Sequence, residues 1–160
     1  MRWILLVACV ASIASARGPQ NAAGRAACKK ALDAGNLDAI RVGWTVWLTR
    51  EISQTVEIEK GKLVRKGGWV KNARTERPLA PDEKKQLLDA LRAAHADKLV
   101  WIDRDVKNDQ DRVLNLDVIQ PDGTLLPAGA FVRSGAIWHG GATAPLAALL
   151  EKWLAPSDAK

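Results

Sequence analysis

Two histidines, His95 and His139, are all that the sequence offers for acid–base chemistry near neutral pH or for binding zinc. Neither stands at the spacing of a zinc motif from a second ligand. Ser134 lies shortly before His139, but the Gly-x-Ser-x-Gly turn that presents a serine nucleophile is missing. A hydrolase that uses His139 is therefore the last of the functions we consider.

Carboxylates recur along the polar run 103–111, as they do in calcium-binding loops. The match to an EF-hand loop fails at its decisive positions. Lys107 replaces an oxygen ligand, Asn108 the required glycine and Leu114 the bidentate glutamate. We therefore predict a solvated loop, no metal site and no cofactor.

Cys28 would be the one cysteine left after removal of an N-terminal segment that contains Cys9. A lone cysteine in an oxidising compartment is either buried and inert or bonded to a second chain. Cys28 lies among alanines and Leu32 on the apolar side of an expected helix, so burial is favoured.

A basic stretch runs from Lys60 to Arg77 and contains Glu76 as its single acid. One interpretation is a solvated hairpin face. The other is a surface that attracts an acidic partner, a polyanion or a membrane surface. The candidate binding residues in this stretch are Lys62, Arg65, Lys66 and Lys71.

Tryptophan dominates the aromatic residues of the chain. Trp44 and Trp47 lie three positions apart in an expected strand and point to opposite faces, so one of them lies outside the main core. An outward Trp47 beside the basic stretch would be a binding anchor, because tryptophan is enriched at interface hot spots. The alternative is a small second apolar cluster under the N-terminal helix.

Trp138 and His139 follow a Ser134-Gly135 turn and precede two glycines. Glycines leave the backbone open, and functional groups gather where strands end, so we expect this strand end to be solvent-accessible. Ser134, Trp138 and His139 are accordingly a candidate edge for contact with a partner's cleft, with Trp138 as the anchor.

Hydrophobic periodicity predicts the elements that position these residues. Helices are expected over Ala22–Ala34, over Pro81–Ala96 and over a last segment that ends near Leu154. Alternation predicts strands over Val42–Leu48, Thr55–Glu59, Leu63–Arg65, Leu114–Val118, Ala130–Arg133 and Ala136–His139. The predicted fold class is α+β, an antiparallel sheet of about five to six strands with helices packed on one face, plus an N-terminal helix.

The first residues have the pattern of a secretory signal peptide, with Arg2, an apolar run Trp3–Ala11 and the small residues Ala14–Ala16. The apolar run is too short to span a bilayer, and no transmembrane segment is expected in the mature chain. We divide the chain into a signal peptide (1–16), a leader with the N-terminal helix (17–38), a single α+β domain (39–155) and a tail (156–160). The expected location is secreted or periplasmic.

Four segments between about Val42 and Leu154 carry a family resemblance. They are the helix start Leu79–Glu83, the stripe Leu87–Leu91, the alternation Leu114–Val118 with its Asp122-Gly123 turn, and the closing helix Pro145–Leu150. Their order resembles small bacterial domains of the emfourin type, which implies a proteinaceous inhibitor of a thermolysin-like metalloprotease such as protealysin. The signal peptide, the Cys28 helix and the basic hairpin depart from that pattern, and no inhibitory residue is carried over.

The Ser134-Gly135 turn followed by Trp138 is also similar to the Ser-Gly-x-x-Tyr loop of periplasmic lysozyme inhibitors. That family is all-β, whereas helices are expected here, and it has tyrosine where Trp138 stands.

Export, compactness and the lack of a catalytic constellation together favour a secreted or periplasmic binding protein that inhibits an extracytoplasmic hydrolase. The alternative is a cell-envelope module that binds an acidic partner through Lys60–Arg77, and the third possibility is an unrecognised hydrolase. The expected partner is a protein, or else an acidic polymer or the envelope surface. Specific binding of nucleic acid is not expected.

We predict cleavage after Ala16, because Ala14-Ser15-Ala16 fits the small-residue exit that signal peptidase requires. N-terminal sequencing of the exported protein should therefore begin at Arg17. Retention of Met1, or a lipid on Cys9 in the lipoprotein-like box Leu6–Cys9, would contradict this argument.

Overall fold

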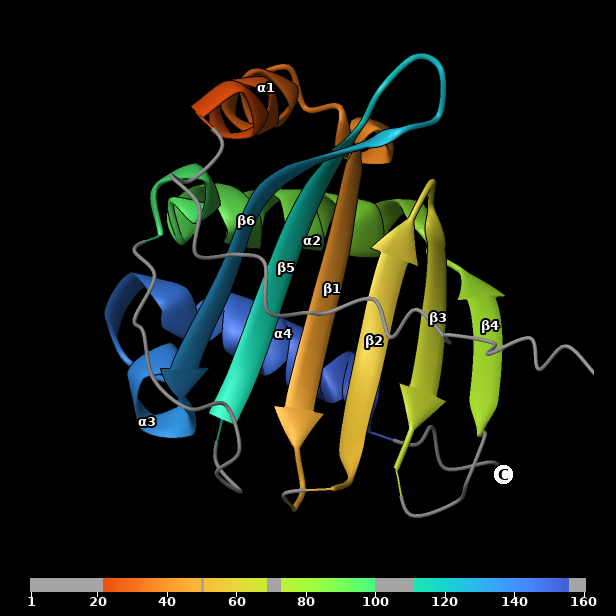
Figure 1. The fold of residues 1–160 in the computed structure, drawn as a ribbon, viewed down its shortest axis with the longest axis vertical. Helices are drawn as coiled ribbons and strands as arrows, with labels where there is room; N and C mark the ends of the chain where they lie inside the picture. Colours follow the sequence, from red (N-terminus) through yellow and green to blue (C-terminus); the bar gives the residue numbers. More distant parts are fainter. Residues whose placement is uncertain (1–21, 50, 69–72, 100–110, 156–160) are drawn as a thin grey trace, which may run out of the picture.

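A 6-stranded sheet with the order β4-β3-β2-β1-β5-β6 forms the body of the molecule in the computed structural model (Figure 1). The structure describes residues 22–49, 51–68, 73–99 and 111–155. All neighbouring strands are antiparallel. In chain order the elements are α1 (Ala22–Asp33), the 3₁₀ turn η2 (Leu37–Ala39), β1 (Ile40–Trp47), β2 (Ser53–Glu59), β3 (Lys62–Gly67), β4 (Arg74–Pro78), α2 (Pro81–Ala93), η3 (Ala96–Lys98), β5 (Asp111–Ile119), β6 (Leu125–Ser134), α3 (Gly135–Trp138), η4 (Gly141–Thr143) and α4 (Ala144–Leu154).

β1 is a central strand of the sheet, since it pairs with β2 on one side and with β5 on the other. Alternate side chains from Ile40 to Val46 are buried in the core. The intervening residues from Arg41 to Trp47 point to the opposite face, as the two-residue period of a strand requires.

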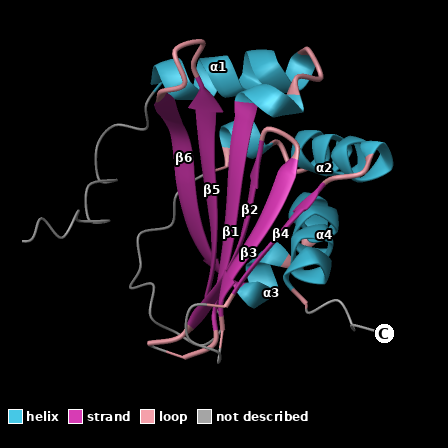
Figure 2. Cartoon of the chain, turned by 90° about the vertical axis from the view of Figure 1, so that its right-hand side faces the viewer, coloured by secondary structure: helices cyan, strands magenta, loops and turns pink. Residues whose placement is uncertain are grey.

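α2 and α4 cover one face of the sheet, and α1 lies across its upper end (Figure 2). Between the sheet and these helices lies one apolar core, whose largest fully buried side chains include Trp44, Trp138 and Phe131. No described helix covers the other face, which we call the open face. Within the described residues, no helix has both the length and the apolar character needed to cross a membrane.

α1 is an integral part of the core. Cys28 and Leu32 are buried, and Gly24 lies so close to β6 that a Cβ there would come within 2.0 Å of the Pro127 carbonyl oxygen. The helix ends in a Schellman motif, in which the Asn36 amide donates to Ala31 and Gly35 takes a φ of +69°. Burial raises the pKa of the Cys28 thiol to about 11, so this cysteine is largely protonated at neutral pH, as an inert buried thiol would be.

The expected α+β class is confirmed. The helices predicted from Ala22 and Pro81 begin where expected, and the closing helix ends at Leu154 and buries Leu146, Leu150 and Trp153 in the core. β3 ends at Gly67, where paired glycines with φ of +81° and +95° turn the chain away.

The strand predicted at Ala130–Arg133 is present as part of β6, whereas the one predicted at Ala136–His139 is wrong. β6 runs from Leu125 to Ser134 along the whole of β5, with a register shift at Leu116/Asp117, and α3 follows it directly. The helical turn brings the Trp138 indole over the core, and the Thr143 hydroxyl then donates to the freed Trp138 carbonyl at 2.9 Å. The packing of Trp138 in the core therefore outweighs the weak alternation of residues 136–139 that predicted a strand.

The edge strand β4 was not expected, because its sequence Arg-Thr-Glu-Arg-Pro lacks an apolar alternation. It forms by pairing with β3, and its charged, exposed side chains are typical of edges that resist further strand pairing.

α2 ends at Ala93 rather than at Ala96, since His95 takes a left-handed φ of +47° and its amide donates to the Arg92 carbonyl.

Glu83 fixes the start of α2. Its carboxylate receives two hydrogen bonds of 2.7 Å from Arg77 and one of 3.0 Å from the Ala80 amide. The Arg77 guanidinium is the main cause that lowers the pKa of Glu83 from its usual 4.5. A lowered pKa in the folded state contributes stability above the unfolded pKa, and this stability is lost as pH falls through the folded value.

Replacement of Glu83 by Gln should therefore lower the free energy of unfolding by about 1 kcal/mol at pH 7. The difference from wild type should shrink as pH falls below 4.5, where Glu83 itself becomes neutral. Urea denaturation between pH 7 and 3 measures both effects. Glu51→Gln, at an exposed loop position, is the matched control and should follow the wild-type curve.

Candidate functional site

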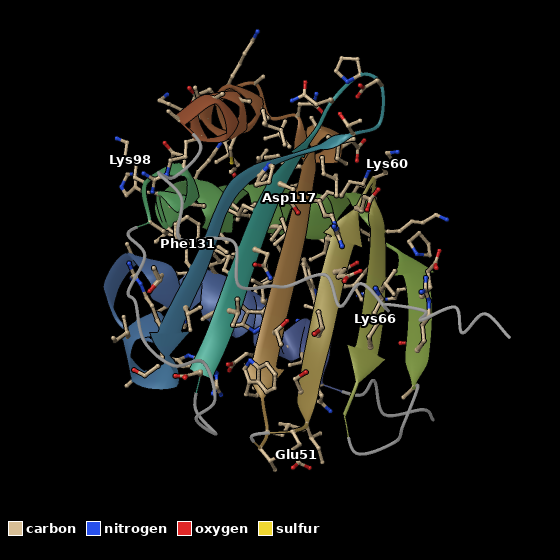
Figure 3. The ribbon with its side chains drawn as sticks, in the orientation of Figure 1. Glu51, Lys60, Lys66, Lys98, Asp117 and Phe131 are labelled. Atoms are coloured by element: carbon tan, nitrogen blue, oxygen red, sulfur yellow. The ribbon has the colours of Figure 1, made fainter. Side chains whose placement is uncertain are left out.

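Polar side chains, Asp117 among them, lie on the open face where β2, β1 and β5 lie side by side (Figure 3). The register places Asp117 opposite Arg41 and Glu57 opposite Gly43. Glu59 follows on the same face of β2. We define the open-face patch as Arg41, Thr45, Trp47, Thr55, Glu57, Glu59 and Asp117.

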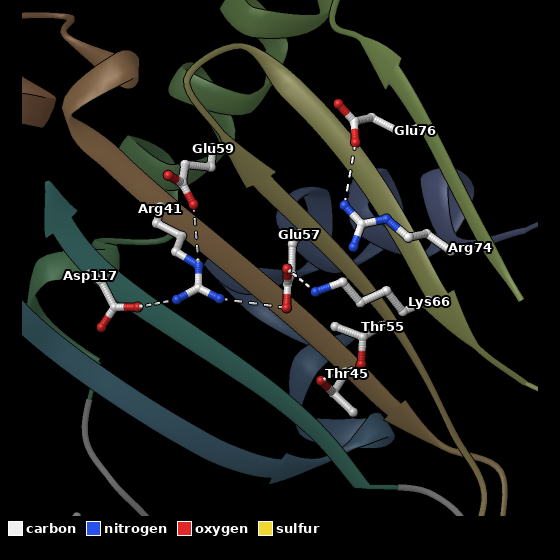
Figure 4. Close-up of polar contacts among 9 residues, drawn as sticks. All are labelled: Arg41, Thr45, Thr55, Glu57, Glu59, Lys66, Arg74, Glu76 and Asp117. Atoms are coloured by element: carbon white, nitrogen blue, oxygen red, sulfur yellow. Dashed lines mark hydrogen bonds and ion pairs between the residues drawn. The ribbon is translucent and has the colours of Figure 1, made fainter. Parts of the chain in front are cut away.

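The Arg41 guanidinium lies among three carboxylates (Figure 4). Its Nη2 is 3.6 Å from Glu57 Oε1, its Nε is 3.7 Å from Glu59 Oε2 and its Nη1 is 3.7 Å from Asp117 Oδ2. These are ion-pair distances, longer than N–H···O hydrogen bonds. Three charges thus hold the guanidinium in place, while none of the hydrogen bonds among the described residues uses it as a donor.

Asp117 is the most buried of the three carboxylates, with 22% of its side chain exposed. Burial raises the pKa of its carboxyl group, the positive charge of Arg41 lowers it, and the neighbouring Glu59 raises it further. The net result is a raised pKa for Asp117, and the positive charge of Arg41 limits this rise.

Trp47 extends the open-face patch toward the lower end of β1, beyond the hydrogen-bonded pair Thr45 and Thr55, whose hydroxyl oxygens lie 2.9 Å apart. Trp44 points into the core and Trp47 to the open face, which confirms that one of the two lies outside the main core. The end of β1 that carries Trp47 is far from α1 (Figure 1), so Trp47 does not belong to a cluster under that helix. Its indole Nε1 has no hydrogen-bond partner in the described structure.

The basic stretch does not form a single face. Lys62 and Lys66 point to the open face and pair with Glu76 at 3.1 Å and with Glu57 at 2.6 Å. Arg65 points the other way and donates its Nε to the carbonyl of Trp153 in α4. Lys71 lies outside the described residues. Strand alternation thus separates the predicted binding residues, and acids neutralise two of them.

Trp138 is fully buried, so the expectation of a solvent-accessible anchor is wrong. Its ring meets that of Trp44 edge-on, at 5.1 Å between centroids and an angle of 79°, and its Nε1 donates to the Arg112 carbonyl at 3.1 Å. The Arg133 guanidinium lies 5.5 Å from the ring centre. Because residues 135–138 form the helical turn α3, the indole of Trp138 points into the core. At the end of a strand, as predicted, it would have been exposed.

His139 is exposed at the end of α3, and its Nε2 lies 3.0 Å from Glu151 Oε2 in α4. Glu151 also accepts a 2.8 Å hydrogen bond from Arg112. Ser134 instead ends β6 opposite Asp111. None of the described hydrogen bonds joins Ser134 to His139, so the structure does not assemble a serine–histidine pair from them.

No group of three histidine, cysteine, aspartate or glutamate side chains is placed to bind a metal within the described ranges. The acidic run 103–110 lies outside these ranges. Asp111, which was expected to close that loop, is instead the buried first residue of β5.

Reasoning from the sequence missed Arg41 and its three carboxylates. The signal was present, because Arg41, Glu57, Glu59 and Asp117 occupy the polar positions of alternating strands. Only the register between β2, β1 and β5 shows that these positions are neighbours.

Comparison with protein-family models, with curated proteins and with solved structures gives no significant match to this chain.

Replacement of Trp138 by Ala should lower the free energy of unfolding by roughly 3–5 kcal/mol, because it leaves a cavity beside Trp44 in the core. Chemical denaturation followed by circular dichroism measures this loss. Trp47→Ala, at the half-buried open-face position, is the matched control and should cost clearly less stability. Equal losses in the two variants would contradict the assignment of Trp138 to the core.

Proposed function

We propose that this chain is an exported binding protein that inhibits an extracytoplasmic hydrolase and contacts this protein partner through the open-face patch. The observation that carries the proposal is the state of Arg41, which three carboxylates hold at 3.6 to 3.7 Å. A guanidinium that is already positioned loses little conformational freedom on binding. Its N–H groups form no hydrogen bond among the described residues and remain available for a carbonyl oxygen of the partner.

The composition of the open-face patch supports a protein partner. Arginine and tryptophan, here Arg41 and Trp47, are the residue types most enriched at the energetic centres of protein interfaces. The threonine pair and the carboxylates add acceptors and donors around them. A surface that mixes both signs of charge with an aromatic ring suits a folded protein of complementary pattern better than a uniform polyanion.

The alternative, an envelope module that binds an acidic polymer through the basic stretch, has less support. Lys62 and Lys66 are each paired with a glutamate, and Arg65 points to the helix-covered side. A long polyanion would need to displace these glutamates before it could contact the lysines. Export and an inhibitory role rest on the signal-peptide pattern of residues 1–16 and on the emfourin-type resemblance.

The test compares capture of a partner from culture supernatant and envelope fractions by wild type, Arg41→Ala and Trp47→Ala, with Lys85→Ala on exposed α2 surface as the matched control. We expect wild type and the control to retain the same protein. The two patch variants should bind it more weakly by about 2 kcal/mol or more, roughly thirtyfold in affinity. Arg41→Lys keeps the charge but loses the planar fork, so intermediate binding is expected.

The captured protein is then assayed for hydrolase activity with increasing amounts of the wild-type chain. Inhibition that Arg41→Ala loses supports the whole proposal, provided that thermal melting shows the variant to be folded. Undiminished binding by both patch variants contradicts the assigned surface. If the chain leaves the hydrolase activity of the captured protein unchanged, the inhibitory role is contradicted. If binding is lost as the salt concentration rises to the physiological range, where charges are screened beyond about 8 Å, the acidic-polymer alternative is favoured instead.

A further inference from the structure

A separate pocket of about 210 Å³ lies where β2 and β4 begin and β3 ends, beside the last turn of α4. It is independent of the open-face patch, because none of the patch residues lines it. We call it the β3–β4 pocket. Its lining residues are Gln54, Arg65, Lys66, Gly67, Ala73, Arg74, Thr75 and Leu154.

The lining of the β3–β4 pocket contains three bases and no acid. Arg65 is the base whose position is fixed, since its Nε donates to the Trp153 carbonyl of α4. This bond occupies one side of the guanidinium. Its two Nη groups take part in no hydrogen bond or ion pair among the described residues, and they are the pair of donors that binds an oxyanion in bidentate fashion.

Lys66 and Arg74 stand on neighbouring strands at the register pair Lys66↔Arg74. Each has an acidic neighbour, Glu57 at 2.6 Å from Lys66 and Glu76 at 3.3 Å from Arg74 (Figure 4). These ion pairs lie on the open face, because the register of β3 with β2 and β4 turns Lys66 and Arg74 to that side and Arg65 to the helix-covered side. Arg65 is therefore the charged group that faces the helix-covered side of the pocket.

The remaining lining residues supply neutral hydrogen-bonding groups and a glycine at which two strands approach each other closely. Gln54 and Thr75 add an amide and a hydroxyl. Gly67 has a φ of +81°, and a Cβ on it would lie 2.3 Å from the Ser53 carbonyl oxygen. Only glycine allows β3 to turn at so short a distance from β2, so the shape of the pocket depends on Gly67.

We propose that the β3–β4 pocket binds a single oxyanion group, a phosphate or a carboxylate, with Arg65 as its bidentate anchor and Gln54 and Thr75 as neutral hydrogen-bonding partners. Its volume of about 210 Å³ is enough for one such group together with a short stem. The oxyanion can therefore belong to a small metabolite or to an acidic group on a larger partner. This site is distinct from the contact surface of the proposed function and does not rest on it.

The test uses the ¹⁵N-labelled protein, purified as the cell produces it, and follows its amide resonances during titration with inorganic phosphate. Parallel titrations use acetate and, at matched ionic strength, chloride. We expect saturable shifts at Gln54, Arg65 and Thr75 with phosphate or acetate but not with chloride, and the more tightly bound anion identifies the ligand class. Chloride shifts equal to those of both oxyanions would overturn the proposal.

Arg65→Gln should weaken the binding of that anion about tenfold, as expected for loss of a charge-assisted hydrogen-bonded pair. Lys85→Gln removes the same charge from α2, away from the pocket, and should bind as wild type does. Arg65→Gln also loses the bond to Trp153, so Thr75→Val on the edge strand is the second variant; it removes a hydroxyl beside Arg65 and should weaken binding without unfolding the chain. Binding by Thr75→Val and by a folded Arg65→Gln at wild-type strength would overturn the assignment. Arg41→Ala should leave anion binding unchanged, which separates this site from the open-face patch.

Discussion

The two-residue alternation of β1 is the constraint on which the rest of the structure depends. One set of its side chains, centred on Trp44, fills the core beneath α2 and α4, and the other set, centred on Arg41 and Trp47, forms the open face. A shift of one residue in the pairing would exchange the two sets and bury Arg41 among leucines. The apolar core and the charged cluster on the open face therefore specify the same register, one by burial and the other by charge.

Local signals in the sequence were sufficient for the three long helices α1, α2 and α4 and for most of the sheet. The Gly35 end of α1, the proline start of α2 and the leucine stripe of α4 each have a physical cause within a few residues. The failures have non-local causes. β4 exists because β3 offers it a partner, and residues 135–138 turn helical because the Trp138 indole packs against Trp44 from a different strand.

The same distinction holds for the functional surface. Alternation alone correctly placed one of Trp44 and Trp47 outside the main core. It could not bring Arg41, Glu57 and Asp117 together, since their contact depends on the register of β1 with β2 and with the distant strand β5. The basic stretch from Lys60 to Arg77 shows the converse. It forms one continuous block in the sequence, and the sheet divides it between an ion-paired open face and a pocket beside α4.

The pairing of β1 with β5 has a consequence for when the chain can fold. Ile40 lies opposite Val118, and α1 packs against β6, so the first elements of the domain meet elements that are synthesised much later. β1 cannot occupy the centre of the sheet until β5 has joined it, and the core stays open until α4 arrives. Contacts of such long sequence separation form slowly. A nascent chain with this topology therefore completes its core only after its last helix has been synthesised.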